Sequence, residues 1–191
     1  MKYLNPRPVA LFAVLSALCI GIQLAPRFPS IGFTPLLVFL AGAIFGRLKG
    51  AIFGASVMFI NGFLSPWGFA GIILPFQMAG MTITGAAGGI YGQTRKDIYT
   101  RETSLETAVL GAILTIIYDL ITNFGYAILY YYPNLPLLPA VLFAIVSGAP
   151  FTLVAVISNC VIFSIVFFPM VKTIQQFLGG ESIWRKKSSP I

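Results

Sequence analysis

A single carboxylate in the middle of a long apolar segment is the strongest chemical signal in this chain. Asp119 lies about 14 residues beyond Leu105, where the segment begins, and this places it roughly 21 Å along a helix. A carboxylate at the centre of a membrane helix costs roughly 2.5 to 3.5 kcal/mol, so its presence there points to a function. Asn123 and Tyr126 follow at spacings of four and seven residues and share its helical face. This stripe predicts one wall of a ligand-binding site, with a hydrogen-bond network between helices as the alternative.

Amide side chains in three other apolar segments could complete such a site. They are Asn61, Gln77 and Asn159, and each could contact a ligand or bridge neighbouring helices. Trp67 and Phe76 could supply a stacking wall, although Trp67 also fits an aromatic belt at the outer membrane surface. We therefore predict a common pocket between several helices, in the outer half of a membrane.

The residue types that the sequence lacks exclude most enzymes. The chain has no histidine, and its two cysteines, Cys19 and Cys160, lie in separate apolar segments. A His-containing metal site, a Ser-His protease and a Cys-His nucleophile are thereby excluded. A single intramembrane acidic residue excludes a paired-aspartate protease, and without a Walker-type loop the chain cannot hydrolyse ATP. We predict a protein that is not an enzyme and that holds neither a metal nor a cofactor.

Six apolar segments are expected to position these residues. The hydrophobic fraction is 58% and the mean hydropathy is +0.91, as expected for a chain that crosses a membrane several times. We predict one all-α domain over residues 1–191 with six transmembrane helices, at Pro8–Ala25, Thr34–Gly46, Gly50–Leu64, Ile72–Gly92, Leu105–Tyr130 and Gly148–Lys172. The second and third are shorter than the roughly 20 residues that a vertical crossing needs.

The basic residues give this arrangement an orientation. Of the 12 Lys and Arg residues, all except Arg27 precede the first segment, follow the last or lie at every second boundary between segments. Basic residues concentrate in cytoplasmic loops, so we predict a multi-pass protein of the cell membrane with both termini in the cytoplasm. The net charge of +7 then reflects topology and not binding to nucleic acid.

The segment from Pro133 to Ser147 leaves two alternatives open. Three prolines interrupt it early, and Gly148 and Pro150 follow it. Residues 137–146 could form a short helix on the outer surface, between the fifth and sixth transmembrane helices, that caps an outward-facing cavity. They could equally be a continuation of the sixth helix.

Small residues recur at helical spacing. Ala13 and Ala17 form a small-xxx-small pair, with Ala10 on nearly the same face. Glycines recur in the second to fourth segments, at Gly42, Gly46, Gly50, Gly54, Gly85, Gly88 and Gly92. Such residues let helices approach closely. We expect the glycines to pack the bundle and the first helix to present an exposed docking face.

Three local motifs extend these observations. They are Pro75-Phe76-Gln77-Met78, Tyr118-Asp119-Leu120 with Asn123, and Gly148-Ala149-Pro150-Phe151-Thr152 followed by Asn159. With them the chain resembles, over nearly its whole length, the substrate-binding S components of energy-coupling factor (ECF) vitamin transporters. The Ala13 and Ala17 pair also resembles the alanine motif by which the first helix of this family docks on its coupling subunit.

The resemblance implies a mechanism and a set of partners. An S component binds a vitamin or related micronutrient in an outward-facing pocket, docks on a transmembrane coupling subunit with two cytoplasmic ATPases, and topples to release the ligand inward. One carboxylate and no buried base favour a neutral ligand, or one with a cation or several donors facing Asp119. They disfavour a dianion unless Arg27 folds in from its loop. Cobalamin-type, thiamine-related, pyrimidine and biotin-like ligands all remain open.

Two other functions fit the same residues. A self-sufficient oligomeric transporter or channel would use Asp119 as a proton or ion site and the glycine stripes as contacts between subunits. A noncatalytic assembly subunit would use the polar residues only to join helices. Proton-coupled uptake without ATPases would indicate the first, and ligand binding by the isolated protein would count against the second.

Overall fold

The computed structural model describes residues 6–24, 30–64, 69–95 and 101–177, and these residues form helices and short connections without any strand. The elements are α1 (Pro6–Leu24), α2 (Thr34–Phe45), α3 (Arg47–Leu64), the 3₁₀ turn η1 (Gly71–Ile73), α4 (Leu74–Thr94), α5 (Arg101–Tyr126), the π-helical turn η2 (Ala127–Tyr131) and α6 (Leu137–Phe177). The prediction of an all-α fold with six helices is confirmed for the described residues. Apart from the start of α6, the predicted bounds lie within a few residues of those observed.

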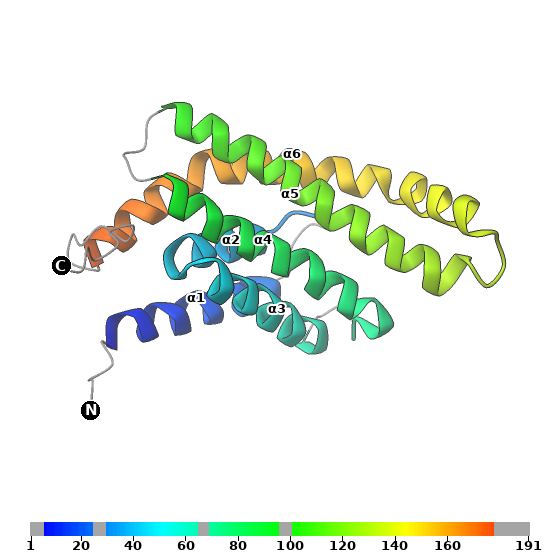
Figure 1. Ribbon diagram of the computed structural model, residues 1–191, viewed down its shortest axis with the longest axis horizontal. Coiled ribbons are helices and arrows are strands. Elements are labelled where there is room, and N and C mark those ends of the chain that lie inside the picture. The colour runs from blue at the N-terminus through cyan, green and yellow to red at the C-terminus, as the bar shows by residue number, and fades with distance from the viewer. Residues whose placement is uncertain (1–5, 25–29, 65–68, 96–100, 178–191) are drawn as a thin grey trace, which may run out of the picture.

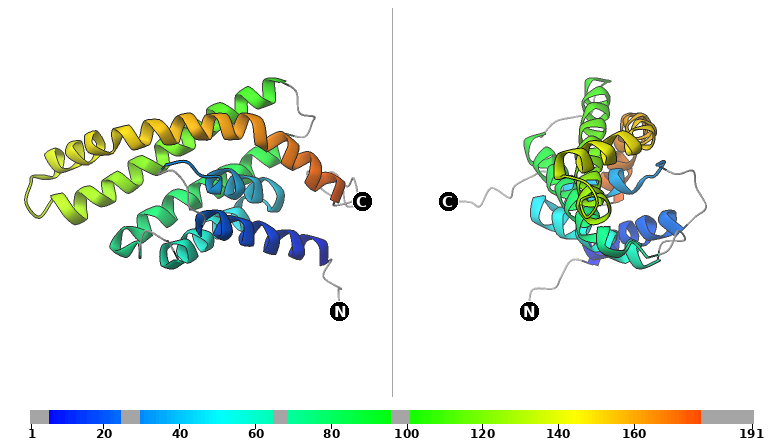
Figure 2. Two further views of the ribbon diagram at one scale, coloured as in Figure 1. Left: turned by 180° about the vertical axis from the view of Figure 1, so that it is seen from behind. Right: turned by 90° about the vertical axis from the view of Figure 1, so that its right-hand side faces the viewer.

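The helices α5 and α6 form a long antiparallel hairpin, α2 and α4 pack against one side of it, and α1 and α3 lie beyond α2 and α4 (Figure 1). The turn of this hairpin extends beyond the ends of the other helices (Figure 1). α2 lies at the centre, in contact with α1, α3, α4 and α6, and two further views show the same layout (Figure 2). This position explains its composition: α2 carries no charged residue, and residues Leu36 to Ala43 are all buried.

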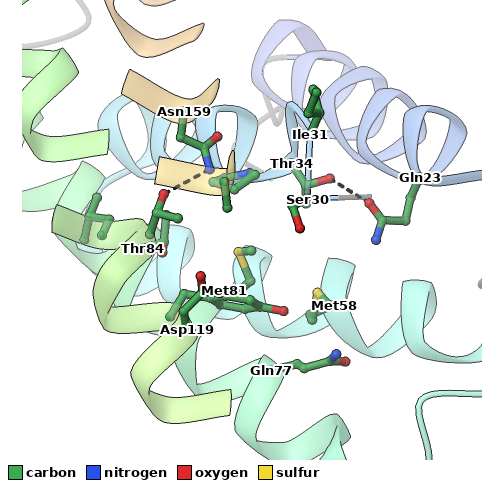
Figure 3. A pocket seen from close by; sticks show the side chains of 16 residues that line it. Gln23, Ser30, Ile31, Thr34, Met58, Gln77, Met81, Thr84, Asp119 and Asn159 are labelled. Atoms are coloured by element: carbon green, nitrogen blue, oxygen red, sulfur yellow. Dashed lines mark hydrogen bonds between the residues drawn. The ribbon is translucent and has the colours of Figure 1, made fainter. Parts of the chain in front are cut away.

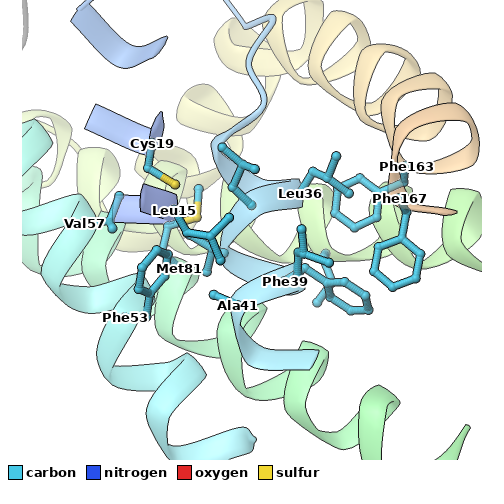
Figure 4. Close-up of a cluster of buried hydrophobic side chains, with 14 of the residues drawn as sticks. Leu15, Cys19, Leu36, Phe39, Ala41, Phe53, Val57, Met81, Phe163 and Phe167 are labelled. Carbon is cyan, nitrogen blue, oxygen red and sulfur yellow. The ribbon is translucent and has the colours of Figure 1, made fainter. Parts of the chain in front are cut away.

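Aromatic rings fill the space between α2, α4 and α6. Phe39 of α2 is fully buried, and its ring centroid lies 5.5 Å from those of Tyr91 and Phe163 and 5.6 Å from that of Phe167. The cluster continues to Leu15 of α1 (Figure 4). Contacts between such rings contribute about 0.5–1.5 kcal/mol each beyond the burial of their area. They fix α2 against the hairpin that carries Asp119.

Glycines allow α2, α3 and α4 to meet backbone to backbone. A methyl group added at Gly42 would collide with the carbonyl of Gly85, and one added at Gly50 would collide with the backbone of Gly42. A methyl group at Gly88 would collide with the carbonyl of Phe39. Helices approach this closely only where the Cβ atom is absent. The expected role in packing the bundle is therefore confirmed for Gly42, Gly50, Gly54, Gly85 and Gly88, whereas Gly46 makes no such close contact.

The hairpin turn is followed directly by α6, which decides between the two alternatives for residues 137–146, and the possible separate outer helix is not formed. Leu137 is the first residue of a continuous helix that ends at Phe177. Pro139 lies in its first turn, where a backbone N–H has no partner within the helix, so a proline is tolerated there. Pro150 lies inside the helix and does not end it. The alternative in which residues 137–146 continue the sixth helix is the one observed.

Two helical stretches are long and apolar enough to cross a membrane, at Thr103–Tyr131 and Leu137–Ile174. The apolar stretches Val9–Leu24 and Thr34–Phe45 are shorter. The start of α1, the turn between α2 and α3, the end of α4, the start of α5 and the end of α6 all lie at one end of the bundle (Figures 1 and 2). The hairpin turn lies at the opposite end.

Candidate functional site

Two cavities, each of about 350 Å³, adjoin one another because Ser30 and Asp119 line both. The central cavity is bounded by α1, α3, α4, α5 and α6 and by the segment before α2 (Figure 3), and its polar lining includes Gln23, Thr34, Gln77, Thr115, Asp119 and Asn159. The hairpin cavity lies between α5 and α6, and its lining includes Asn123, Tyr126, Tyr131, Ser147, Phe151 and Thr152. Each volume falls at the lower end of the range for small-molecule sites, about 300–1,000 Å³.

Asp119 stands where the two cavities meet. Thr152 of α6 lines the hairpin cavity together with Asp119, and its hydroxyl interacts with the carboxylate. Among the described residues, no Lys or Arg lines either cavity. A half-buried carboxylate without a basic neighbour is stabilised by a cation, by further donors or by water.

Three groups in series fix the orientation of the Asn159 amide. The Thr115 hydroxyl donates to the carbonyl oxygen of Gly111 over 2.7 Å, and Nδ2 of Asn159 donates to Oγ1 of Thr115 over 2.9 Å. Since Thr115 has one proton and donates it to Gly111, its oxygen can only accept, and the amide must present its nitrogen. Oδ1 of Asn159 is therefore a buried acceptor, and it has no hydrogen-bond partner in the described part of the chain. An unpaired buried acceptor costs about 1–3 kcal/mol.

Other groups of the central cavity also present acceptors. The hydroxyl of Thr34 donates to Oε1 of Gln23 over 3.1 Å, and the hydroxyl of Thr84 donates to the carbonyl of Gly80 over 3.1 Å. Oε1 of Gln77 is buried, and no described residue supplies it with a donor. Because the hydroxyl protons are used within the protein, the threonine oxygens on this wall can only accept.

The structure brings five of the predicted site residues to these cavities. Asp119, Gln77 and Asn159 line the central cavity, and Asp119, Asn123 and Tyr126 line the hairpin cavity. The predicted face of α5 therefore lines the two cavities from Asp119 to Tyr126, over a helical rise of about 10 Å.

The other predicted residues lie elsewhere. Asn61 is buried in α3 at 2% exposure and lines neither cavity, and its amide atoms have no hydrogen-bond partner among the described residues. Phe76 also lines neither cavity, because its ring packs against Gly125 of α5. Trp67, and Arg27 with it, lie outside the described residues.

Several lining residues have no counterpart in the sequence-based prediction. Thr115 lies four residues before Asp119 on the same helix, so the helical period that identifies Asn123 could also have identified it. Gln23 lies at the end of α1, Ser30 in the connection before α2, and Thr34 at the start of α2. No spacing rule connects them to Asp119, because tertiary packing alone brings these helix ends to α5.

One face of α1 is exposed. Ala10, Ala13 and Ala17 are all exposed, whereas Leu11, Leu15 and Cys19 on the other face are buried in the bundle. The alternation follows the helical period and leaves a row of small side chains without contacts from the described bundle.

The lining of the two cavities is suited to binding an organic ligand. Among the described residues, no group of three or more His, Cys, Asp or Glu could hold a metal ion. The cavities instead combine one carboxylate, several amides and hydroxyls, and aromatic rings, which are the groups that orient an organic ligand. No protein-family model matches the chain, and no curated protein is similar to it in sequence.

Proposed function

We propose that this chain is a membrane-embedded solute-binding subunit, the S component of an ECF-type importer. The observation that carries the proposal is the pair of cavities that meet at Asp119, lined by polar groups whose acceptors lack partners within the described protein. Buried polar groups that only join helices would be paired with one another. Oδ1 of Asn159 and Oε1 of Gln77 are not paired in this way among the described residues, and both side chains line the central cavity, which favours binding over an assembly role.

The exposure of apolar side chains supports a place in the membrane. The apolar windows of Thr103–Tyr131 and Leu137–Ile174 are only 33% and 22% buried within the protein. The core helix of a soluble protein is mostly buried, and an exposed apolar surface of this extent is rare in soluble monomers. Lipid is the medium that would cover these side chains, which include Leu138, Val146 and Leu153.

The distribution of charge supports the proposed orientation. Arg47, Lys49, Arg95 and Lys172 all belong to helix ends at the same end of the bundle, and Arg95 forms an ion pair with Glu106 there. By the positive-inside rule this end is cytoplasmic. Asp119 then lies about 27 Å along α5 from Arg101, so the cavities belong to the outer half of the membrane.

The exposed alanines of α1 support docking on a coupling subunit. Small residues on a lipid-facing helix permit close approach by a helix of another protein. The glycines of α2, α3 and α4, in contrast, are used inside the bundle, which disfavours the alternative in which they join copies of a self-sufficient transporter. ATP would be hydrolysed by the two ATPases of the assembly.

The test is native mass spectrometry of the protein purified gently in detergent, with extraction and identification of any bound small molecule. We expect a stoichiometric, vitamin-like compound that is lost in Asp119→Asn. Glu106→Gln is the matched control, because it removes a carboxylate from the same helix about 20 Å away. If no compound is bound and no member of a vitamin panel raises the melting temperature of the wild-type protein, the proposal is wrong.

A further inference from the structure

The charged residues that line the two cavities limit the charge that a ligand can carry. Asp119 is the one carboxylate on the walls of both cavities, and no Lys or Arg of the described residues accompanies it. Opposite charges about 4 Å apart attract strongly where water is partly excluded, and like charges repel by a similar amount. A carboxylate or phosphate group on the ligand would therefore be repelled at the point where the cavities meet.

The hydrogen-bonding groups of the central cavity point to the same class. Oδ1 of Asn159 and Oε1 of Gln77 are buried acceptors with no donor among the described residues. The hydroxyls of Thr34, Thr84 and Thr115 already donate to other groups, so they cannot donate to a ligand. The amide nitrogens of Gln23 and Gln77 can donate to an acceptor atom on the ligand, and they add no charge to the lining.

The hairpin cavity adds aromatic surface next to the carboxylate. Tyr126, Tyr131 and Phe151 contribute to its lining, and Ser30 and Asp119 connect it to the central cavity. The ring of Tyr131 is held edge-on against that of Phe143, with centroids 4.9 Å apart. Aromatic rings beside a carboxylate bind organic cations, because the ring faces and the carboxylate both attract positive charge.

We infer that the ligand is a nitrogenous organic cation, an amidine-like or amino-substituted ring that places its charge against Asp119, where the two cavities meet. The inference rests on the proposed function and narrows it from any micronutrient to this class. The Asp119 carboxylate accepts hydrogen bonds only, so the ligand needs N–H donors beside its positive charge. The aromatic lining accommodates the ring that carries them.

Three probes of matched size and shape test the inference: benzamidine, benzamide and benzoate. Their dissociation constants are measured by ligand-observed NMR on the full-length protein near neutral pH, after any co-purified compound has been washed out. We expect benzamidine to bind at least about tenfold more tightly than benzamide, and benzoate to bind more weakly than either. The Asp119→Asn variant should lose about tenfold or more of the affinity for benzamidine and less than about threefold of that for benzamide.

One matched pair of variants and a further control keep the test decisive if Asp119→Asn fails to fold. Gln77→Glu should strengthen benzamidine binding by a few fold, whereas Gln93→Glu, the same change on an exposed site of α4 outside both cavities, should not. Glu106→Gln should leave the binding of all three probes unaffected.

Benzoate binding as tightly as benzamidine, or a co-purified compound with net negative charge, would overturn the inference while leaving the proposed function intact. If none of the probes binds and no compound co-purifies, the inference fails, and the vitamin panel decides separately whether the proposed function fails with it. If a compound does co-purify, the sign of its net charge decides whether the inference is correct.

Discussion

Replacement of Gly85 by alanine should separate α3 from α4. The added Cβ atom would collide with the carbonyl of Gly50 and lie 3.1 Å from the backbone nitrogen of Ala51. Since the nearest atoms all belong to the backbone, no side chain can rotate away and one helix must move. Overpacking costs about 1–3 kcal/mol where neighbours adjust and more where they cannot, and the higher helix propensity of alanine offsets about 1 kcal/mol. We expect Gly85→Ala to lower the free energy of unfolding by about 2 kcal/mol or more.

Gly21 of α1 provides the matched control. It also lies within a helix, but no atom lies within 4 Å of the position that its Cβ would take. Gly21→Ala should leave the free energy of unfolding unchanged or raise it by up to about 1 kcal/mol. Both variants are compared with the wild type by equilibrium unfolding in the same detergent, with helix content followed by circular dichroism. A Gly85→Ala protein as stable as Gly21→Ala would refute the reasoning, because it would show that α3 and α4 are not in backbone contact.

Three further predictions concern the site, the core and the orientation. Thr115→Val removes the hydroxyl that fixes the Asn159 amide and should lower the free energy of unfolding by about 1–2 kcal/mol; additivity with Asn159→Leu in a double-mutant cycle would contradict the hydrogen bond. Phe39→Ala removes a fully buried ring and should cost about 3–5 kcal/mol in the same unfolding assay, and a loss below about 1 kcal/mol would argue against the aromatic cluster. In a chain whose two cysteines are replaced by alanine, a cysteine at exposed Asn134 should react with a membrane-impermeant maleimide on intact cells. One at exposed Gln93 should react only after lysis, and reaction of both from outside would contradict the proposed orientation.

Much of the fold follows from the sequence because apolar runs and basic boundaries both mark the ends of helices. The bounds of α2 are predicted closely, since Thr34 begins an apolar run and Gly46, with a φ of +91°, ends it. The continuity of α6 is not predictable in the same way. In the sequence, Pro150 indicates the end of a helix. One missing backbone N–H inside a long helix is nevertheless tolerated where neighbouring segments satisfy the backbone group that it leaves unpaired.

The site is predictable on a single helix but not between helices. The period of α5 places Asp119, Asn123 and Tyr126 on one face, and that face lines the cavities. The orientations of Asn61 and Phe76 depend on how α3 and α4 are rotated in the bundle. In apolar helices the hydrophobic pattern does not define this rotation, because both the lipid-facing and the buried faces are apolar.

Transport by the reconstituted protein tests the central claim most directly. The chain is purified alone, and also as the complex that a tag on the chain retrieves from its host membranes, and each is placed in liposomes with the co-purified compound outside. We predict that the compound accumulates only with the complex, only with ATP at the nucleotide-binding subunits, and not with Asp119→Asn in the same complex. Accumulation driven by a proton gradient through the chain alone would contradict the account and establish a self-sufficient transporter.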